Sequence, residues 1–268
     1  MRFGLAVPNF ADFSDVRLIE EVAAGAEASG WDGFFLWDHI ARSSAWGPGL
    51  AFADVTVALS AVALATETIT FGTLVTPVPR RRPHKLAREF ATLDRLSGGR
   101  AVLGVGIGSP AEDEFTAFGE VDDARTRGDI LDESLGAIQR LWSGEPVDFD
   151  GKHVTIHTPP FLPSPVQRPR IPIWAAARWP SKGRTLRRAR ALDGIVPIPA
   201  DPSGEARLEP SDVAHVRHAV GEDLEIVVTG ERLGDPTELE RAGATWYVIA
   251  ATQREKALAA ARSGPSSS

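Results

Sequence analysis

An aspartate and a histidine stand together where an apolar segment ends. Asp38 and His39 follow residues 34–37, and an uninterrupted apolar run of this length is typical of a buried strand. Histidine titrates near neutral pH, so His39 could hydrogen-bond to a reacting group or exchange a proton with it. A structural interpretation, in which His39 is buried and bonded to Asp38 or to the backbone, stays open. Asp38 and His39 are candidate catalytic residues.

Three glycines and a second apolar segment could together accept a planar ring. Gly104, Gly106 and Gly108 stand at alternate positions where another apolar segment ends, and glycine lets a flat molecule approach the backbone. A tight turn that needs glycine for its own geometry is the alternative. The second apolar segment ends in residues suited to form a wall for the ring, namely Leu74, Val75, Thr76 and Pro77.

Small residues followed by an arginine indicate an anion site. Pro180 suits the first turn of a helix over 180–192. The free N–H groups of that turn, with Arg178 beside them, predict a place for a phosphate group. Arg178 could instead pair with a carboxylate, and the other basic residues of this helix could form only a solvated face. The residues of the predicted phosphate site are Ala175, Ala176, Ala177 and Arg178.

Short β-rich segments alternate with helical segments eight times along the chain. This alternation predicts a (β/α)8 TIM barrel, and the lack of a complete nucleotide fingerprint at 104–109 disfavours an open doubly wound sheet. A small hairpin turning at Asp150 and Gly151 is expected before the fifth strand. We expect one domain over 1–262 and a disordered tail over 263–268. The expected strands are 3–7, 33–37, 68–74, 101–105, 171–175, 194–198, 224–228 and 245–250.

Composition excludes several other classes of protein. The net charge of −7 argues against nucleic acid as a partner, and no apolar stretch approaches the length of about 18 residues that would span a membrane. With no cysteine there is no thiolate nucleophile, and the histidines lack the spacing of a metal site, so we expect no metal. A barrel hydrolase or aldolase that works without a cofactor is one alternative function. No lysine stands at a strand end, which disfavours a Schiff-base aldolase. A cytoplasmic location is expected.

Five parts of the chain form recognisable motifs, namely 30–39, 92–100 with 103–106, 141–147 with 150–151, 165–169 and 242–246. Together they resemble the motifs of one known family, the luciferase-like monooxygenases, which are flavin-dependent oxidoreductases. In (β/α)8 barrels the active site lies at the C-terminal ends of the strands, which is where the candidate residues above are expected to meet. The similarity extends over most of the chain up to about residue 194 and returns near its end.

The resemblance implies an oxidoreductase that binds FMN or the deazaflavin coenzyme F420 in the mouth of the barrel. It implies that His39 lies beside the ring, that the bond between Leu74 and Val75 is a cis peptide, and that segment 175–178 receives the cofactor phosphate. We expect Trp46, with Trp37, to shape a pocket for a small organic substrate; surface packing of Trp46 is the alternative. A flavin reductase or an F420-reducing enzyme would then be a partner, and a homodimer is left open.

The sequence also departs from the family's pattern. Dehydrogenases of this family that use F420 commonly have a glutamate directly after the fourth-strand glycines, whereas this chain has Ser109 and Pro110 there, with Glu112 and Glu114 further on. The strand-five segment has alanines where relatives usually have glycines. These departures put a dehydrogenase of that type in doubt and keep open an alternative, a barrel that binds flavin without catalysis.

Overall fold

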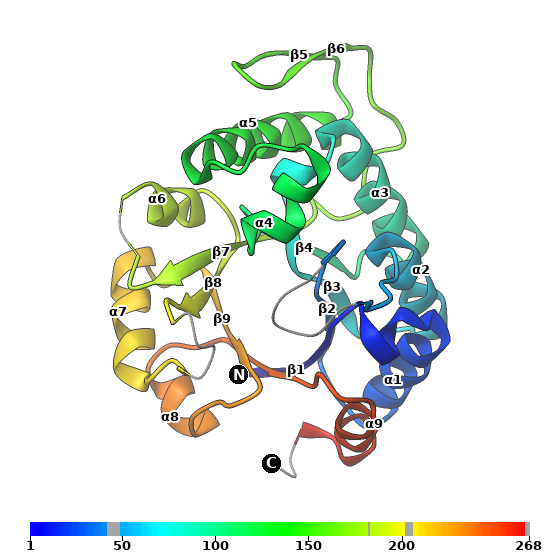
Figure 1. Ribbon diagram of the computed structural model, residues 1–268, viewed down its shortest axis with the longest axis vertical. Helices are drawn as coiled ribbons and strands as arrows, with labels where there is room; N and C mark the ends of the chain where they lie inside the picture. Colours follow the sequence, from blue (N-terminus) through cyan, green and yellow to red (C-terminus); the bar gives the residue numbers. More distant parts are fainter. Residues whose placement is uncertain (42–48, 182, 202–205, 266–268) are drawn as a thin grey trace.

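The computed structural model describes residues 1–41, 49–181, 183–201 and 206–265. Its parallel strands form a closed barrel in the spatial order β1-β10-β9-β8-β7-β4-β3-β2, and Figure 1 shows the helices around it. The predicted (β/α)8 barrel is confirmed. The strands of the barrel are β1 (Arg2–Val7), β2 (Gly33–Leu36), β3 (Thr70–Pro77), β4 (Ala101–Gly106), β7 (Ile173–Trp179), β8 (Gly194–Pro199), β9 (Glu225–Gly230) and β10 (Trp246–Ala250).

Several helices begin where side chains or proline satisfy their first turn. Asp15, Asp54 and Asp123 each accept a hydrogen bond from a backbone N–H of the helix that follows, and Pro83 and Pro210 occupy first-turn positions. The α-helices are α1 (Val16–Ala28), α2 (Val55–Ala65), α3 (Pro83–Leu96), α4 (Ala111–Glu114), α5 (Ala124–Trp142), α6 (Arg184–Arg190), α7 (Pro210–Val220), α8 (Pro236–Arg241) and α9 (Arg254–Ser263). Short 3-10 helices are η1 (Ala11–Ser14), η2 (Val78–Arg80) and η3 (Thr116–Phe118).

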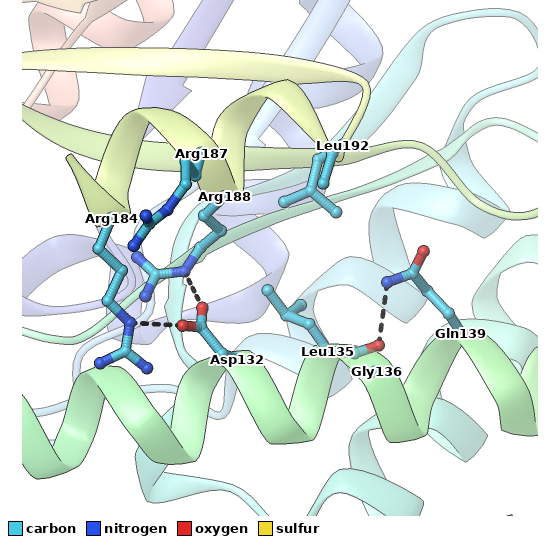
Figure 2. Close-up of a pocket in the computed structure, with 9 residues that line it drawn as sticks. Asp132, Leu135, Gly136, Gln139, Arg184, Arg187, Arg188 and Leu192 are labelled. Carbon is cyan, nitrogen blue, oxygen red and sulfur yellow. Dashed lines mark hydrogen bonds and ion pairs between the residues drawn. The ribbon is translucent and has the colours of Figure 1, made fainter.

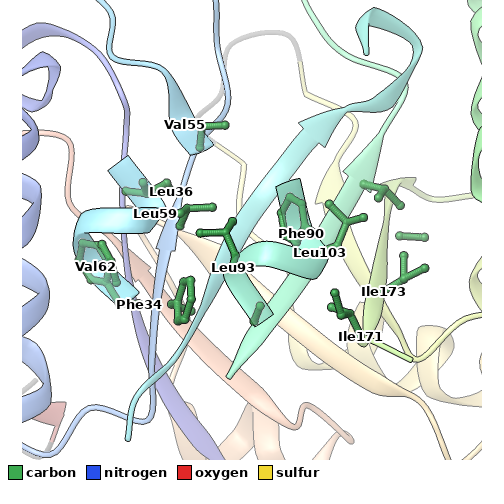
Figure 3. Close-up of a cluster of buried hydrophobic side chains, with 14 of the residues drawn as sticks. Phe34, Leu36, Val55, Leu59, Val62, Phe90, Leu93, Leu103, Ile171 and Ile173 are labelled. Carbon is green, nitrogen blue, oxygen red and sulfur yellow. The ribbon is translucent and has the colours of Figure 1, made fainter. Parts of the chain in front are cut away.

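The hydrophobic core has two layers. The larger layer lies between the strands and the surrounding helices, and Figure 3 shows part of it, with Phe34 and Leu36 of β2 near Leu59 of α2. The smaller layer lies inside the barrel, where the rings of Phe35, Trp174 and Trp246 contact one another with centroids 5.4–5.6 Å apart.

Glycine makes room for these three rings at the N-terminal ends of the strands. A Cβ atom on Gly33 would come within 2.6 Å of the Trp246 ring, and one on Gly194 within 2.6 Å of the Trp174 ring. Trp246 is the first residue of β10, and Trp174 is the second residue of β7. The N-terminal half of the barrel is therefore filled, as is usual for this fold.

Strand β3 carries a bulge against β4. The register between the two strands shifts between Thr73 and Thr76, and the peptide bond between Leu74 and Val75 is cis, as the resemblance implied. A Cβ atom on Gly104 would lie 2.0 Å from the carbonyl oxygen of Thr73, so the close approach of the two strands requires glycine there.

The hairpin expected before the fifth strand is present as β5 (Val147–Asp150) and β6 (Thr155–Thr158), which project beyond α5 (Figure 1). The carboxylate of Glu133 in α5 accepts three backbone N–H groups of its turn, residues 152–154, at 2.7–3.1 Å. Among the residues that the structure describes, Asp148, Asp150 and His157 form a group that could hold a metal ion, but all three are exposed.

Several element boundaries differ from those predicted, and one short helix was not predicted. Strand β7 continues to Trp179, so the helix expected over 180–192 begins only at Arg184 and Pro180 lies outside it. The single turn of α4 was not predicted, because so short a helix has no periodicity. Ser263 is the last residue of α9 and Gly264 is buried, while residues 266–268 of the predicted tail lie outside the described residues.

In the described part of the chain, no helix combines the length and the apolar character needed to cross a membrane.

Candidate active site at the C-terminal ends of the strands

His39 is held from two sides just beyond the end of β2. Its Nδ1 atom lies 2.6 Å from Oε1 of Glu114, whose side chain is fully buried, whereas 15% of the His39 side chain is exposed. The side chain of Asn9, which follows β1, donates to the carbonyl oxygen of His39 at 2.8 Å and accepts from its N–H at 3.0 Å. The orientation of the imidazole is thus set by two other loops of the same end of the barrel.

Asp38 does not act as the partner of His39. Its carboxylate accepts hydrogen bonds from Arg80 at 2.7 Å and from Arg81 at 2.8 Å, and only 3% of the residue is exposed. Burial lowers the pKa of Arg80, and for Arg81 the same burial is outweighed by Asp38, which raises its pKa. Both of its oxygens are bonded to cations, so Asp38 anchors the two arginines, and its catalytic role stays a prediction.

Glu114, which the prediction of catalytic residues left out, belongs to the same cluster as His39. It is the last residue of α4, and its second carboxylate oxygen forms an ion pair with Arg80, which therefore joins Glu114 to Asp38. Its neighbour Glu112 is exposed. The sequence contains only a weak signal for Glu114, an acidic residue a few positions after the glycines of the fourth strand.

The predicted ring-binding residues divide between the two faces of their strands. Leu74 and Val75 belong to the layer inside the barrel, and Gly106 lies against them, because a Cβ atom on it would be 3.0 Å from Val75 and 3.6 Å from Ala176. Val75 and Ala176 are partly exposed and lie beside Gly106, so small apolar groups stand together above the filled half of the barrel. We call Leu74, Val75, Gly106 and Ala176 the cradle.

The other members of the predicted set face away from this cradle. Ala175 and Ala177 are buried in the layer beneath the helices, and the hydroxyl of Thr76 donates to Thr73. Gly108 has a φ of +83°, and a Cβ atom on it would be 2.5 Å from the ring of Phe115, so it serves the turn and the packing of α4. These contacts give each of them a structural role, and their assignment to cofactor binding stays a prediction.

The helix start expected at the predicted phosphate site lies elsewhere, and phosphate binding by its residues stays a prediction. Arg178 is exposed near the end of β7, and its guanidinium donates to Ser109 at 3.4 Å, but α6 begins only at Arg184 and has its N-terminus elsewhere. Arg178 is a long, exposed cationic side chain near the C-terminal end of β7, and it alone could bind a phosphate group there. The small apolar cradle fits a planar ring, so the residues present suit a flat cofactor of the expected kind.

Two further arginines of this region, Arg184 and Arg188, pair with aspartates on the outside of the barrel. Figure 2 shows Arg184 and Arg188 of α6 converging on Asp132 of α5, and Arg184 also pairs with Asp129. They line a pocket of about 360 Å³ between the two helices. These ion pairs support the structural interpretation of the basic cluster.

A pocket of about 390 Å³ opens beside His39. Aromatic rings surround the imidazole: the centroid of Phe10 lies 5.8 Å and that of Trp37 6.2 Å from it. Trp46, expected to shape a substrate pocket, lies outside the described residues. The residues that line the pocket are Asp38, His39, Ile40, Phe52, Ala53, Asp54, Val55, Arg80 and Arg81.

The fold and the site define a (β/α)8 barrel with an ionisable cluster and an apolar cradle at the C-terminal ends of its strands. A family model described as luciferase-like monooxygenase matches residues 1–264. The chain belongs to the luciferase-like monooxygenase family.

Several curated proteins that are similar to this chain carry names that state dependence on F420. The F420-dependent glucose-6-phosphate dehydrogenase of Gordonia bronchialis is 32% identical over 189 residues, which cover 69% of this chain and 54% of that relative. The chain spans about half the length of several further relatives of that name.

Solved structures show the same fold at low identity. The coenzyme F420 dependent tetrahydromethanopterin reductase from Methanopyrus kandleri has a TM-score of 0.74 at 17% identity and covers 98% of both chains. The oxygenating constituent of 3,6-diketocamphane monooxygenase from Pseudomonas putida, in complex with FMN, has a TM-score of 0.65 at 19% identity, covering 92% of this chain and 66% of that one.

Proposed function

We propose that this protein is an oxidoreductase that uses coenzyme F420, in preference to FMN, to interconvert a small uncharged alcohol and its carbonyl compound. The observation that carries the proposal is a histidine held by a buried glutamate at the same end of the barrel as an apolar cradle for a ring. The preference for F420 is supported by the relatives that are more than 30% identical, whose names state dependence on that cofactor.

The ring of the cofactor would be held by Leu74, Val75, Gly106 and Ala176, and its phosphate by Arg178. When bound, the cofactor supplies the acceptor or donor of a hydride, which is the difficult part of the chemistry. The chain's own residues position the substrate and handle its proton. His39 takes the proton of the substrate hydroxyl in the direction of oxidation and returns it to the carbonyl oxygen in the direction of reduction.

The charges of the pocket beside His39 favour an uncharged substrate. Arg80 and Arg81 line it, but both are bonded to Asp38, and Arg80 also pairs with Glu114. Asp54 adds a further negative charge. Among the lining residues that the structure describes, no cation lacks a carboxylate partner, so a phosphorylated sugar gains no ion pair there.

The test is a titration of the purified protein with F420 and, separately, with FMN, followed by turnover assays with neutral secondary alcohols, aldoses and sugar phosphates. We expect binding of F420 in the micromolar range, and turnover with a neutral alcohol or aldose. Replacing His39 by glutamine should lower kcat by a factor of about 10²–10⁴, whereas His84→Gln, at an exposed position of α3, should leave it unchanged.

Two outcomes would contradict the proposal. If neither cofactor binds in the micromolar range, the proposal that the protein is an oxidoreductase is wrong. Binding without turnover of any substrate class would instead support the alternative, a cofactor-binding barrel without catalysis. A reductase for FMN or an enzyme that exchanges electrons with F420, and a homodimer, remain proposals that the same preparations would address.

A further inference from the structure

A buried glutamate is bonded to the histidine that the proposed function assigns to proton transfer. Nδ1 of His39 and Oε1 of Glu114 are 2.6 Å apart, and the Glu114 side chain has no exposed surface. We propose that Glu114 is a positioning residue that fixes the tautomer of His39 and so directs proton exchange to Nε2. The reaction itself rests on the proposed function, but the tautomer is measurable without turnover.

The direction of this hydrogen bond follows from the chemistry of the two groups. A carboxylate only accepts hydrogen bonds, so the hydrogen lies on Nδ1 of His39. In the neutral imidazole the lone pair is then on Nε2, and the substrate O–H bond breaks as the Nε2–H bond forms. The adjacent carboxylate of Glu114 stabilises the imidazolium that results, as in a histidine oriented by an acidic residue in other enzymes.

The segment that carries Glu114 is itself fixed by α5. Arg127 donates to the carbonyl oxygens of Ile107 and Gly108 at 3.0 and 2.9 Å, and its guanidinium lies 4.5 Å from the centroid of the Phe115 ring. Phe115 directly follows Glu114 and is buried. With Asn9 holding the backbone of His39 on the other side, both partners of the hydrogen bond are positioned independently of a substrate.

The groups bonded in this cluster balance in charge when His39 is neutral. Glu114 and Asp38 supply two negative charges, and Arg80 and Arg81 supply two positive ones. Among the residues that the structure describes, the acidic groups near this cluster also include Asp54 at the start of α2, Glu89 of α3 and the buried Asp113 beside Glu114. Arg80 shares the Glu114 carboxylate with His39, which limits how strongly that carboxylate favours the imidazolium.

The first test is the imidazole nitrogen spectrum of ¹⁵N-histidine-labelled protein, measured with and without bound F420. The His39 signals are assigned by their loss in His39→Gln. In the wild type we expect the Nδ1–H tautomer, and in Glu114→Gln a shift of the population toward Nε2–H. The matched control is Glu112→Gln, which removes an exposed carboxylate from the same turn of α4 and should leave the signals in place.

The second test is the pH profile of turnover in the direction of oxidation, for which His39 must be neutral. Without the negative charge of Glu114 the imidazolium forms only at lower pH, so in Glu114→Gln the acid limb should move down by about one pH unit or more. Its kcat should fall by about 10²-fold. Glu114→Asp, which keeps the charge, should recover part of both effects.

The inference is overturned if wild-type His39 carries its hydrogen on Nε2, a result that needs no variant to fold. It is equally overturned if a folded Glu114→Gln loses stability but keeps the tautomer and the acid limb of the wild type. Absence of turnover with every substrate would count against the proposed function and leave the tautomer measurement to decide the role of Glu114.

Discussion

At the scale of single residues, glycine sets the geometry of the bulge that forms the cradle. We predict that Gly104→Ala destabilises the fold by about 2–3 kcal/mol or more, because the new Cβ atom would lie 2.0 Å from a backbone oxygen, that of Thr73, which has no freedom to move aside. The free energy of unfolding from chemical denaturation measures this.

The control for this substitution is Gly25→Ala in α1, where the new Cβ atom meets Ala261 at an ordinary 3.5 Å. That variant should be more stable than the wild type by about 0.5–1 kcal/mol, because alanine is the better helix former. Equal stability of the Gly104 variant and the wild type would show that β3 and β4 separate easily at the bulge.

The same scale shows what a sequence can and cannot predict about the site. His39 is recognisable because an ionisable residue directly follows a buried strand. Its partner Glu114 is 75 positions away in the chain, and no local pattern joins the two. Asp38, adjacent in sequence, is bonded to arginines instead, because successive side chains of extended backbone point in opposite directions.

At the scale of elements, the alternation of strands and helices was sufficient to predict the barrel and its hairpin. The errors lie at the ends of elements. Strand β7 continues past its apolar core through Arg178 and Trp179, since backbone pairing with β8 extends to Pro199 and requires no apolar side chains. Because β7 is longer than predicted, α6 begins at Arg184, and its N-terminus does not lie at the predicted phosphate site.

The hairpin of β5 and β6 provides a prediction at this scale. The hydrogen bond from His157 to Asp148 and the charge of Asp150 raise the pKa of His157 above its ordinary value of 6.5. The contribution of this pair to hairpin stability is therefore complete below about pH 6.5 and is lost as the pH rises through the raised value. NMR titration of His157 should show a midpoint above 6.5, which Asp148→Asn should lower.

An exposed aspartate far from the hairpin supplies the control, since Asp223→Asn should leave the His157 midpoint unchanged. A wild-type midpoint at the ordinary value, or one that Asp148→Asn does not move, would mean that the two strands hold no ion pair in solution.

At the scale of the whole molecule, the barrel separates a filled end from a reactive end. Phe35, Trp174 and Trp246 occupy the N-terminal half of the interior, while the other half presents small residues such as Gly106 and Ala176. Composition alone could not predict this division, because it depends on which residues of eight different strands share a level of the barrel. The division implies that stability and cofactor affinity can be changed independently.

Two substitutions at opposite ends test that independence. Trp246→Phe removes part of a fully buried ring and leaves a cavity, so it should lower the free energy of unfolding by about 1–3 kcal/mol, with the full truncation to alanine costing about 3–5 kcal/mol. Its affinity for F420, from fluorescence titration, should match that of the wild type, because the ring it alters lies at the other end of the strands.

Ala176→Leu should show the reverse: near-normal stability, since Ala176 is partly exposed, but at least tenfold weaker binding, since the added side chain fills the cradle. Weaker binding in the Trp246 variant, or normal binding in the Ala176 variant, would mean that the cofactor does not bind above the rings of Phe35, Trp174 and Trp246.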